Sequence, residues 1–313
     1  MTSQEAFLSG ESTLFVLREE EDPPESVAGE TKTHNVPKNE QQRGVVTFRD
    51  SEPGLTVSVE MVLCVHGWEN PDKQQAVSLM VFDYKLHYTK GDYYIRSVET
   101  EFVFDEMTVS TALGGERANP EVLAYAPFEK ELRWNETTAD VKNERHGDAK
   151  VGGNYIATAE VSAGGAKEIS HQQKYFDRGV ASRKYNNKSR RWDRVSWFLQ
   201  QNGIQGHGVP STFSVAILLR RASDPMYTGT FDLRVEAGLW ENLKSGIRRF
   251  FRKTEDDPVI FNPKRRPEGS RLMKVQKDID EEKLGALAKD DELIKLVKVW
   301  GLDLESFGPL QPS

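Results

Sequence analysis

Hydrophobic and polar residues alternate along most of the chain between Gly44 and Ala237. Apolar residues occupy every second position in four clear runs, namely 55–65, 80–88, 213–219 and 231–237, and four of the six such positions in 94–104. Successive side chains of a strand point to opposite faces, so each run predicts a strand with one buried face. The pattern therefore predicts a mainly β fold, with an antiparallel β-sandwich over residues 44–238.

Two pairs of runs have the pattern of β-hairpins. Residues 195–199 and 213–219 flank a glycine-rich turn that is closed by Pro210, and residues 80–88 and 94–104 flank a short turn at 89–92. Short glycine-containing connections favour antiparallel pairing of successive strands. We therefore expect each pair to form one hairpin.

The middle of the chain has a different composition. Residues 121–126 predict a short strand before Pro127, and the polar stretch 135–152 predicts a loop. In 155–163, Tyr, Ala and Val at odd positions alternate with Ile, Thr, Glu and Ser at even ones, which predicts a strand of small residues whose partner is 172–187. Such strands specify their register weakly, so residues 152–182 could open into an amphipathic hairpin.

The two ends of the chain depart from the period of two. Residues 1–43 contain the acidic cluster Glu19–Asp22 and predict a disordered leader. Residues 239–313 predict a helical extension, because apolar residues of 239–251 recur every three or four positions. A second amphipathic helix is expected over 280–300, with one apolar face. This face comprises Leu284, Leu287, Leu293, Ile294, Leu296, Val297 and Trp300.

Charge and cysteine content indicate the cellular location and the class of partner. The chain has 313 residues, a formal net charge of −7 and a single cysteine, Cys64. An acidic chain is not generally attracted to nucleic acid, and a single thiol favours a reducing compartment. The N-terminal residues lack the pattern of a signal peptide, and no apolar run is long enough for a transmembrane segment. We therefore expect a cytoplasmic protein with no nucleic-acid partner.

Several of these runs resemble a large uncharacterised protein family of filamentous fungi. The resemblance is carried by VSWFL at 195–199, GVP at 208–210, Phe213 and AILLR at 216–220. The strand at 98–104, the PEVLAYAP segment at 120–127 and the Gly- and Tyr-rich stretch 152–179 are also similar. The resemblance covers about residues 55–262 and implies a β-rich fold. It implies no catalytic residue.

The strongest candidate binding residues are basic. Five of them lie on the polar side of the expected helix over 239–253, namely Lys244, Arg248, Arg249, Arg252 and Lys253. A basic amphipathic helix can bind anionic lipid or an acidic protein partner, including the acidic leader. Alternatively, its apolar face packs on the sheet and its cations remain solvated.

A second basic group combines cations with an aromatic residue, at Arg190, Arg191 and Trp192. This combination can bind nucleic acid, but the acidic net charge favours a solvated loop or sheet edge. His207 lies between two glycines and could line a pocket, although the turn itself explains those glycines.

No catalytic or cofactor motif appears in the sequence. The six histidines lack metal-ligand spacing, and Cys64 lies in an apolar strand that predicts a buried, unreactive thiol. We expect no cofactor and favour a non-enzymatic intracellular binding or interaction module. Two alternatives stay open. One is a membrane-surface or pore-forming-like lipid-binding protein, and the other is an enzyme or accessory factor of fungal secondary metabolism that uses a cavity in the sheet.

Overall fold

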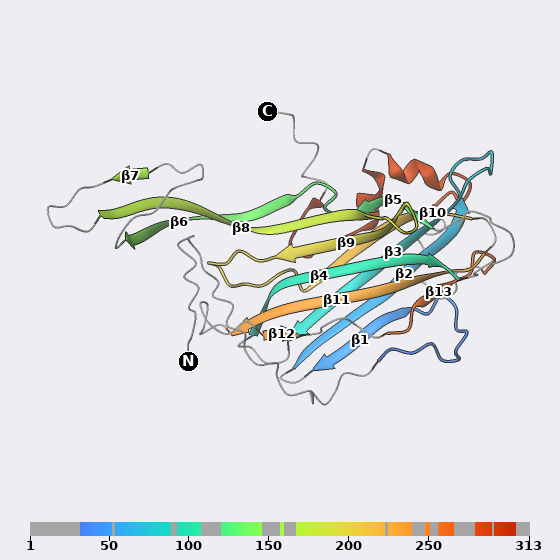
Figure 1. Cartoon of the computed structure of the whole chain (residues 1–313), viewed down its shortest axis with the longest axis horizontal. Helices are drawn as coiled ribbons and strands as arrows, with labels where there is room; N and C mark the ends of the chain where they lie inside the picture. Colours follow the sequence, from blue (N-terminus) through green and yellow to red (C-terminus); the bar gives the residue numbers. More distant parts are fainter. Residues whose placement is uncertain are drawn as a thin grey trace, which may run out of the picture. The chain divides into compact units, whose positions relative to one another are not determined.

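The structure is a computed structural model of the chain (Figure 1). It describes residues 32–51, 54–88, 93–107, 120–145, 157–159, 167–222, 225–239, 248–250, 256–265, 279–289 and 291–304. These residues divide into two compact units. The described residues of Thr137–Tyr175 form the hairpin unit, and those of Ala28–Glu136 and Phe176–Ser313 form the sandwich unit.

The predicted mainly β fold is confirmed, with two antiparallel sheets. The first sheet has the order β1 (Val45–Ser51), β2 (Leu55–Trp68), β3 (Ala76–Tyr88), β10 (Thr212–Arg221) and β5 (Glu121–Ala126). The second has the order β12 (Arg248–Phe250), β11 (Tyr227–Leu239), β4 (Tyr93–Glu106), β9 (Arg191–Gln200), β8 (Lys167–Asn186) and β6 (Leu132–Arg145). Two short strands, β7 (Ala157–Ala159) and β13 (Val259–Phe261), pair with β8 and β11.

An apolar core fills the space between the two sheets in the sandwich unit. The rings of Phe82 on β3 and Phe102 on β4 stack across it with centroids 4.4 Å apart. The hydroxyl groups of Tyr84 and Thr100 also meet across the core at 3.0 Å, and Trp197 on β9 is completely buried. The inward faces of the period-two strands therefore do form a shared interior, as the sequence predicts.

Both expected hairpins are wrong, because their strands belong to different sheets. β9 pairs with β4 and β8, whereas β10 pairs with β3 and β5. Likewise β3 pairs with β2 and β10, whereas β4 pairs with β9 and β11. Each connection therefore crosses from one sheet to the other. Alternation identifies the buried face of a strand but not its neighbour, and two strands that face one core from opposite sheets show the same pattern.

The polar stretch 135–152, expected to be a loop, instead contains most of β6. This strand runs from Leu132 to Arg145 and is the last strand of the second sheet, beside β8. Edge strands expose polar side chains and are therefore poorly distinguished from loops by their sequence. The expected strand at 172–187 is present as part of β8, which ends at Asn186. The 155–163 segment does pair with β8 through β7, but with residues 169–171 rather than with the expected range.

Part of the predicted leader packs on the sandwich unit. Thr33 N–H donates a hydrogen bond to the carboxylate of Asp256 (2.7 Å), and Arg49 pairs with the same buried carboxylate at 2.8 Å. The Arg43 guanidinium binds Asn35 and backbone carbonyls of this region, including that of Val46 (3.2 Å). Residues 32–43 are therefore part of the folded structure, while the acidic cluster lies outside the described residues.

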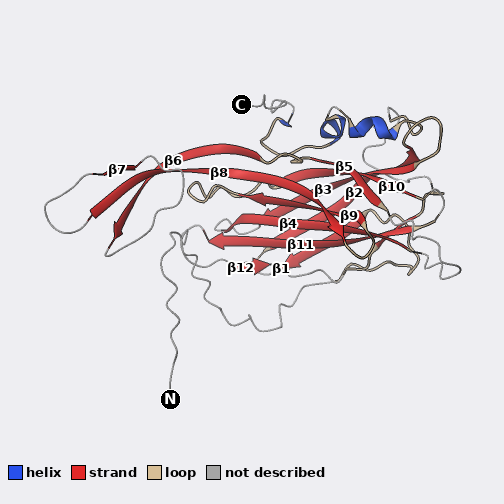
Figure 2. Cartoon of the chain, turned by 45° about the horizontal axis from the view of Figure 1, so that its top comes forward, coloured by secondary structure: helices blue, strands red, loops and turns tan. Residues whose placement is uncertain are grey.

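The C-terminal extension contains no long helix among the described residues. Two 3₁₀ helices, η2 (Leu284–Ala288) and η3 (Glu292–Leu296), replace the expected helix over 280–300 (Figure 2). Leu284, Leu293 and Val297 are buried, and they pack on the outer face of the five-stranded sheet. Apolar residues spaced three or four apart therefore reach the sheet from short turns rather than from one helix.

The expected basic helix over 239–253 is also corrected by the described residues. Leu239 ends β11, and Arg248 and Arg249 lie in β12, which pairs with Ala237 and Glu236 of β11. Lys244, Arg252 and Lys253 lie outside the described residues. A strand at 248–250 breaks the helical spacing on which the predicted basic face depends.

Candidate functional site

Two long strands pass from the sandwich unit into the hairpin unit. β6 has 14 residues and β8 has 20, and the boundary between the units falls after Glu136 on β6 and before Phe176 on β8. In the sequence, β7 lies between β6 and β8, and it pairs antiparallel with β8 through Ala157 and His171, Thr158 and Ser170, and Ala159 and Ile169. The described centre of the 155–163 segment is therefore a strand, and its remaining residues lie outside the described part.

A buried carboxylate lies next to this boundary. The side chain of Asp177 on β8 is 3% exposed. Its Oδ2 lies 2.8 Å from Nε2 of His207 and accepts a 2.6 Å hydrogen bond from the Asn135 amide on β6. Its Oδ1 accepts the backbone N–H of Asn202, whose own amide donates to the Asn135 carbonyl at 2.8 Å. We call these four residues the Asp177 clamp.

The Asp177 clamp joins three parts of the sandwich unit at the point where the hairpin strands leave it. Asn135 comes from β6, Asp177 from β8, and Asn202 and His207 from the loop between β9 and β10. Removing a buried carboxylate that accepts several hydrogen bonds lowers stability strongly, because the buried donors then have no acceptor. His207, which the sequence made a candidate because of its glycine turn, thus belongs to the Asp177 clamp. The sequence gives no indication that Asp177 is its partner, because only strand pairing brings the two together.

The other predicted basic group lies at the turn between β8 and β9. Arg190 has a left-handed backbone (φ 55°), and Arg191 and Trp192 begin β9. Trp192 is 36% exposed, contacts Tyr185 with centroids 5.4 Å apart, and carries the Arg183 guanidinium 4.9 Å above its ring. This cation–aromatic contact occupies one face of the indole.

The same turn is fixed by a second buried carboxylate. The side chain of Asp193 accepts hydrogen bonds from the Asn186 amide and the Ser189 hydroxyl, both at 2.7 Å. Asp177 and Asn186 are nine residues apart on β8, which corresponds to about 30 Å at about 3.3 Å per strand residue. His207 and Trp192 therefore lie at opposite ends of the sandwich unit and do not form one site.

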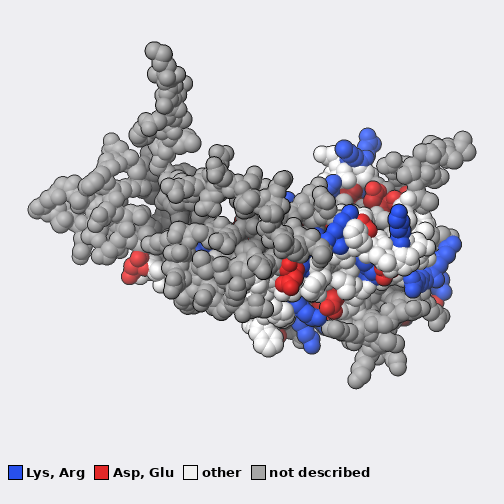
Figure 3. Space-filling model, turned by 90° about the horizontal axis from the view of Figure 1, so that it is seen from below, with Lys and Arg blue, Asp and Glu red and all other residues white. Residues whose placement is uncertain are grey.

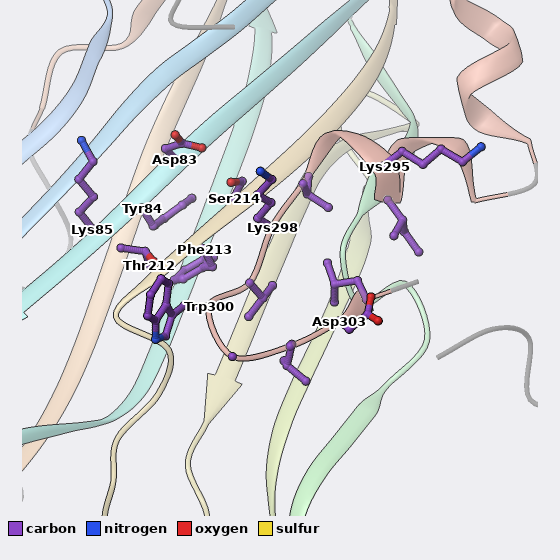
Figure 4. Close-up of a pocket in the computed structure, with 16 residues that line it drawn as sticks. Asp83, Tyr84, Lys85, Thr212, Phe213, Ser214, Lys295, Lys298, Trp300 and Asp303 are labelled. Carbon is purple, nitrogen blue, oxygen red and sulfur yellow. The ribbon is translucent and has the colours of Figure 1, made fainter. Parts of the chain in front are cut away.

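An open groove lies between the C-terminal segment and the first sheet. Its volume is about 560 Å³, and residues from β3, β10 and 294–304 line it (Figure 4). The Ser214 N–H donates to the Lys298 carbonyl (2.7 Å), and the Trp300 N–H donates to that of Thr212 (3.0 Å). This segment is thus bound along β10 like a short extra strand. The charges of the rim are mixed, as they are on the face shown in Figure 3.

Cys64 is buried, as predicted, in a small polar network inside the first sheet. Burial raises the pKa of its thiol to about 12, so it is protonated at neutral pH. Nδ1 of His66 lies 2.7 Å from Oγ of Ser78, which also accepts a hydrogen bond from Arg221. The His66 Nε2 lies 2.7 Å from the Gln42 amide. Burial, reinforced by the Arg221 charge, lowers the pKa of His66 to about 3, and the imidazole is therefore neutral.

The described residues hold neither a metal-binding cluster nor a membrane-spanning helix. Nowhere in the described ranges do three or more His, Cys, Asp or Glu side chains come together in a way that could hold a metal ion. None of the helices in the described part of the chain has the length and apolar character needed to cross a membrane.

Comparison with known proteins identifies no family. No family model matches the sequence, and no curated protein matches it. Among solved structures, the Clostridium perfringens NetB toxin in its membrane-inserted form is similar at 8% identity and a TM-score of 0.24, over 68% of this chain and 91% of that chain. At this TM-score the likeness does not define a shared fold. The resemblance to a fungal family and the cytoplasmic location stay predictions.

Proposed function

We propose that this protein binds lipid membranes and inserts the segment between β6 and β8 into the bilayer. The observation that carries the proposal is the alternation in 155–163 within a hairpin of long strands. Tyr155, Ala157, Ala159, Val161 and Ala163 alternate there with Ile156, Thr158, Glu160 and Ser162, so one face is apolar and three of the four residues on the other are polar. Strands that cross membranes alternate in this way, because one face contacts lipid and the other contacts water.

The lengths of the strands support the same proposal. A strand crosses the hydrocarbon region with about 9–11 residues. β8 has 20 residues, of which those before Phe176 belong to the hairpin unit, and β6 supplies the opposite arm. The hairpin therefore has enough chain to cross while its base remains in the sandwich unit. Alanine-rich strands pack weakly in water, which lowers the cost of moving this segment.

Insertion of this kind requires several copies of the chain. At the outer edge of an inserted hairpin, backbone N–H and C=O groups would have no hydrogen-bond partner in the lipid. Each such group costs roughly several kcal/mol. Pairing with the hairpin of a neighbouring copy satisfies these groups. The proposed function thus includes assembly on the membrane, with the apolar odd-numbered face toward lipid.

The two other functions considered from the sequence have less support. An enzyme with a cavity between the sheets is disfavoured, because aromatic side chains from both sheets meet in that space. A non-enzymatic binding module is compatible with the proposal, since membrane binding needs no catalytic residue. The predicted lipid contact through a basic helix is not retained, because the described part of that segment is a strand.

Release of a trapped dye from phospholipid vesicles tests the proposal. We expect the full chain to release the dye, with a steep dependence on protein concentration because several copies must pair. Ala159→Arg places a charge on the lipid-facing side and should reduce release at least tenfold, since an arginine there costs about 2–4 kcal/mol near the middle of the bilayer. Thr158→Arg, on the other face, should release dye like the unmodified chain. Absence of release, or equal loss in both variants, would contradict insertion.

A further inference from the structure

Trp300 is the most informative residue of the described C-terminal segment. Its neighbours Val297 and Val299 are buried, at 5% and 3% exposure, whereas Trp300 itself is 74% exposed. The sequence places Trp300 on the apolar face of a helix, but the segment pairs with β10 as a strand and directs Lys298 and Trp300 outward. About three quarters of the surface of Trp300 is therefore open to solvent, while its backbone is held by the hydrogen bond to Thr212.

Trp300 lies at the end of the sandwich unit where the hairpin strands leave. Its N–H binds Thr212, the first residue of β10, which directly follows the loop that contains His207 of the Asp177 clamp. That loop begins after Gln200, which pairs with Arg178 on β8. The exposed Ile204 belongs to the same loop. Trp192, whose exposed fraction is 36%, lies at the opposite end.

Lys298 lies two residues before Trp300 in this segment. Lys85 and Lys295, which also line the groove, are paired with Glu60 (3.1 Å) and Glu292 (2.6 Å). Lys298 is exposed, and no acidic residue in the described ranges forms an ion pair with it. Figure 4 shows Trp300 near Thr212 and Lys298 near Ser214.

We infer that Trp300 and Lys298 form the surface by which the sandwich unit docks on a phospholipid bilayer. Tryptophan favours the membrane–water interface, because its ring is apolar while its N–H can remain hydrogen-bonded. A lysine beside it can reach the phosphate groups of the lipid. Docking here brings the exit of β6 and β8 to the membrane surface. The inference rests on the proposed function and names the contact that precedes insertion.

Flotation with vesicles, followed by measurement of the bound fraction, tests this docking surface. We expect Trp300→Ala to bind phosphatidylcholine vesicles about tenfold more weakly than the unmodified chain, because the indole no longer enters the interface. Trp192→Ala is the matched control and should bind normally. Lys298→Ala should weaken binding on vesicles that also contain phosphatidylserine, and its control Lys188→Ala, at the β8–β9 turn, should not. All four side chains are at least partly exposed, so each variant should keep its thermal unfolding midpoint.

The outcomes separate the docking surface from the proposed function. If Trp300→Ala binds vesicles as tightly as the unmodified chain, or if Trp192→Ala is equally impaired, the docking surface is wrong. Dye release by the unmodified chain would still support insertion in that case. If the unmodified chain binds no vesicles, the proposed function and the docking surface both fail.

Discussion

Replacement of Asp177 by alanine is expected to lower the free energy of unfolding by about 3 kcal/mol. The buried carboxylate accepts hydrogen bonds from Asn135 and Asn202 and contacts His207. Without it, the buried Asn202 N–H loses its acceptor, and β6, β8 and the 201–211 loop lose their common partner. Chemical denaturation gives the loss of stability. Hydrogen exchange should also be faster in residues 132–136 and 176–180, where the strands leave the sandwich unit.

Asp193→Ala provides a matched control for this prediction. Asp193 is also a buried carboxylate that accepts two short hydrogen bonds, but it lies on β9, next to the turn between β8 and β9. We expect it to destabilise the chain while leaving exchange near Asn135 unchanged. Substitutions on a protein surface usually change the free energy of unfolding by less than about 0.5 kcal/mol. If Asp177→Ala lowers it by no more than this, the Asp177 clamp does not hold the base of the hairpin.

Acidification is expected to destabilise the protein through His66. The folded pKa of about 3 lies below the ordinary value of 6.5, so the unfolded chain binds the proton first as the pH falls. The contribution of His66 is fully present above pH 6.5 and is lost between pH 6.5 and about 3, at up to about 1.4 kcal/mol per pH unit. Over this pH range the loss in the free energy of unfolding reaches roughly several kcal/mol, which is comparable with the loss expected for Asp177→Ala.

The slope of stability against pH checks this prediction. His66→Gln should flatten the decrease in the free energy of unfolding between pH 6.5 and 4, whatever its effect on stability at pH 7. His87→Gln alters an exposed histidine of β3 and should leave the slope unchanged. A slope that His66→Gln does not alter would mean that the buried imidazole takes up its proton in the folded state.

The strands were predictable from the sequence, but their order in the sheets was not. Alternation depends only on which side of a strand is buried, so it identifies β2, β3 and β11 directly. The sheet that a strand joins depends on the path of the connection, and the glycine-rich loop after Gln200 gives no sign that it crosses the core. β6 was missed for a different reason, since an edge strand with a polar outer face lacks a buried alternation.

The C-terminal predictions failed because apolar spacing was interpreted as one continuous helix. Leu284 and Leu293 do pack on the sheet, as their spacing indicates, but from two separate 3₁₀ turns. Trp300 was assigned to the same face and is instead exposed. The partners of His207 were unpredictable, because Asp177 and Asn135 reach it only through the pairing of strands that are far apart in the sequence.

Labelling of single cysteines along 157–161 with a polarity-sensitive dye tests the central claim most directly. The native Cys64 is buried and its thiol is protonated, so the label should react with the introduced cysteine. When vesicles are added, we predict that dyes at 157, 159 and 161 report an apolar environment while those at 158 and 160 stay in water. Dyes that remain in water at all five positions, or that shift without alternation, would contradict insertion of this segment as a membrane-crossing strand.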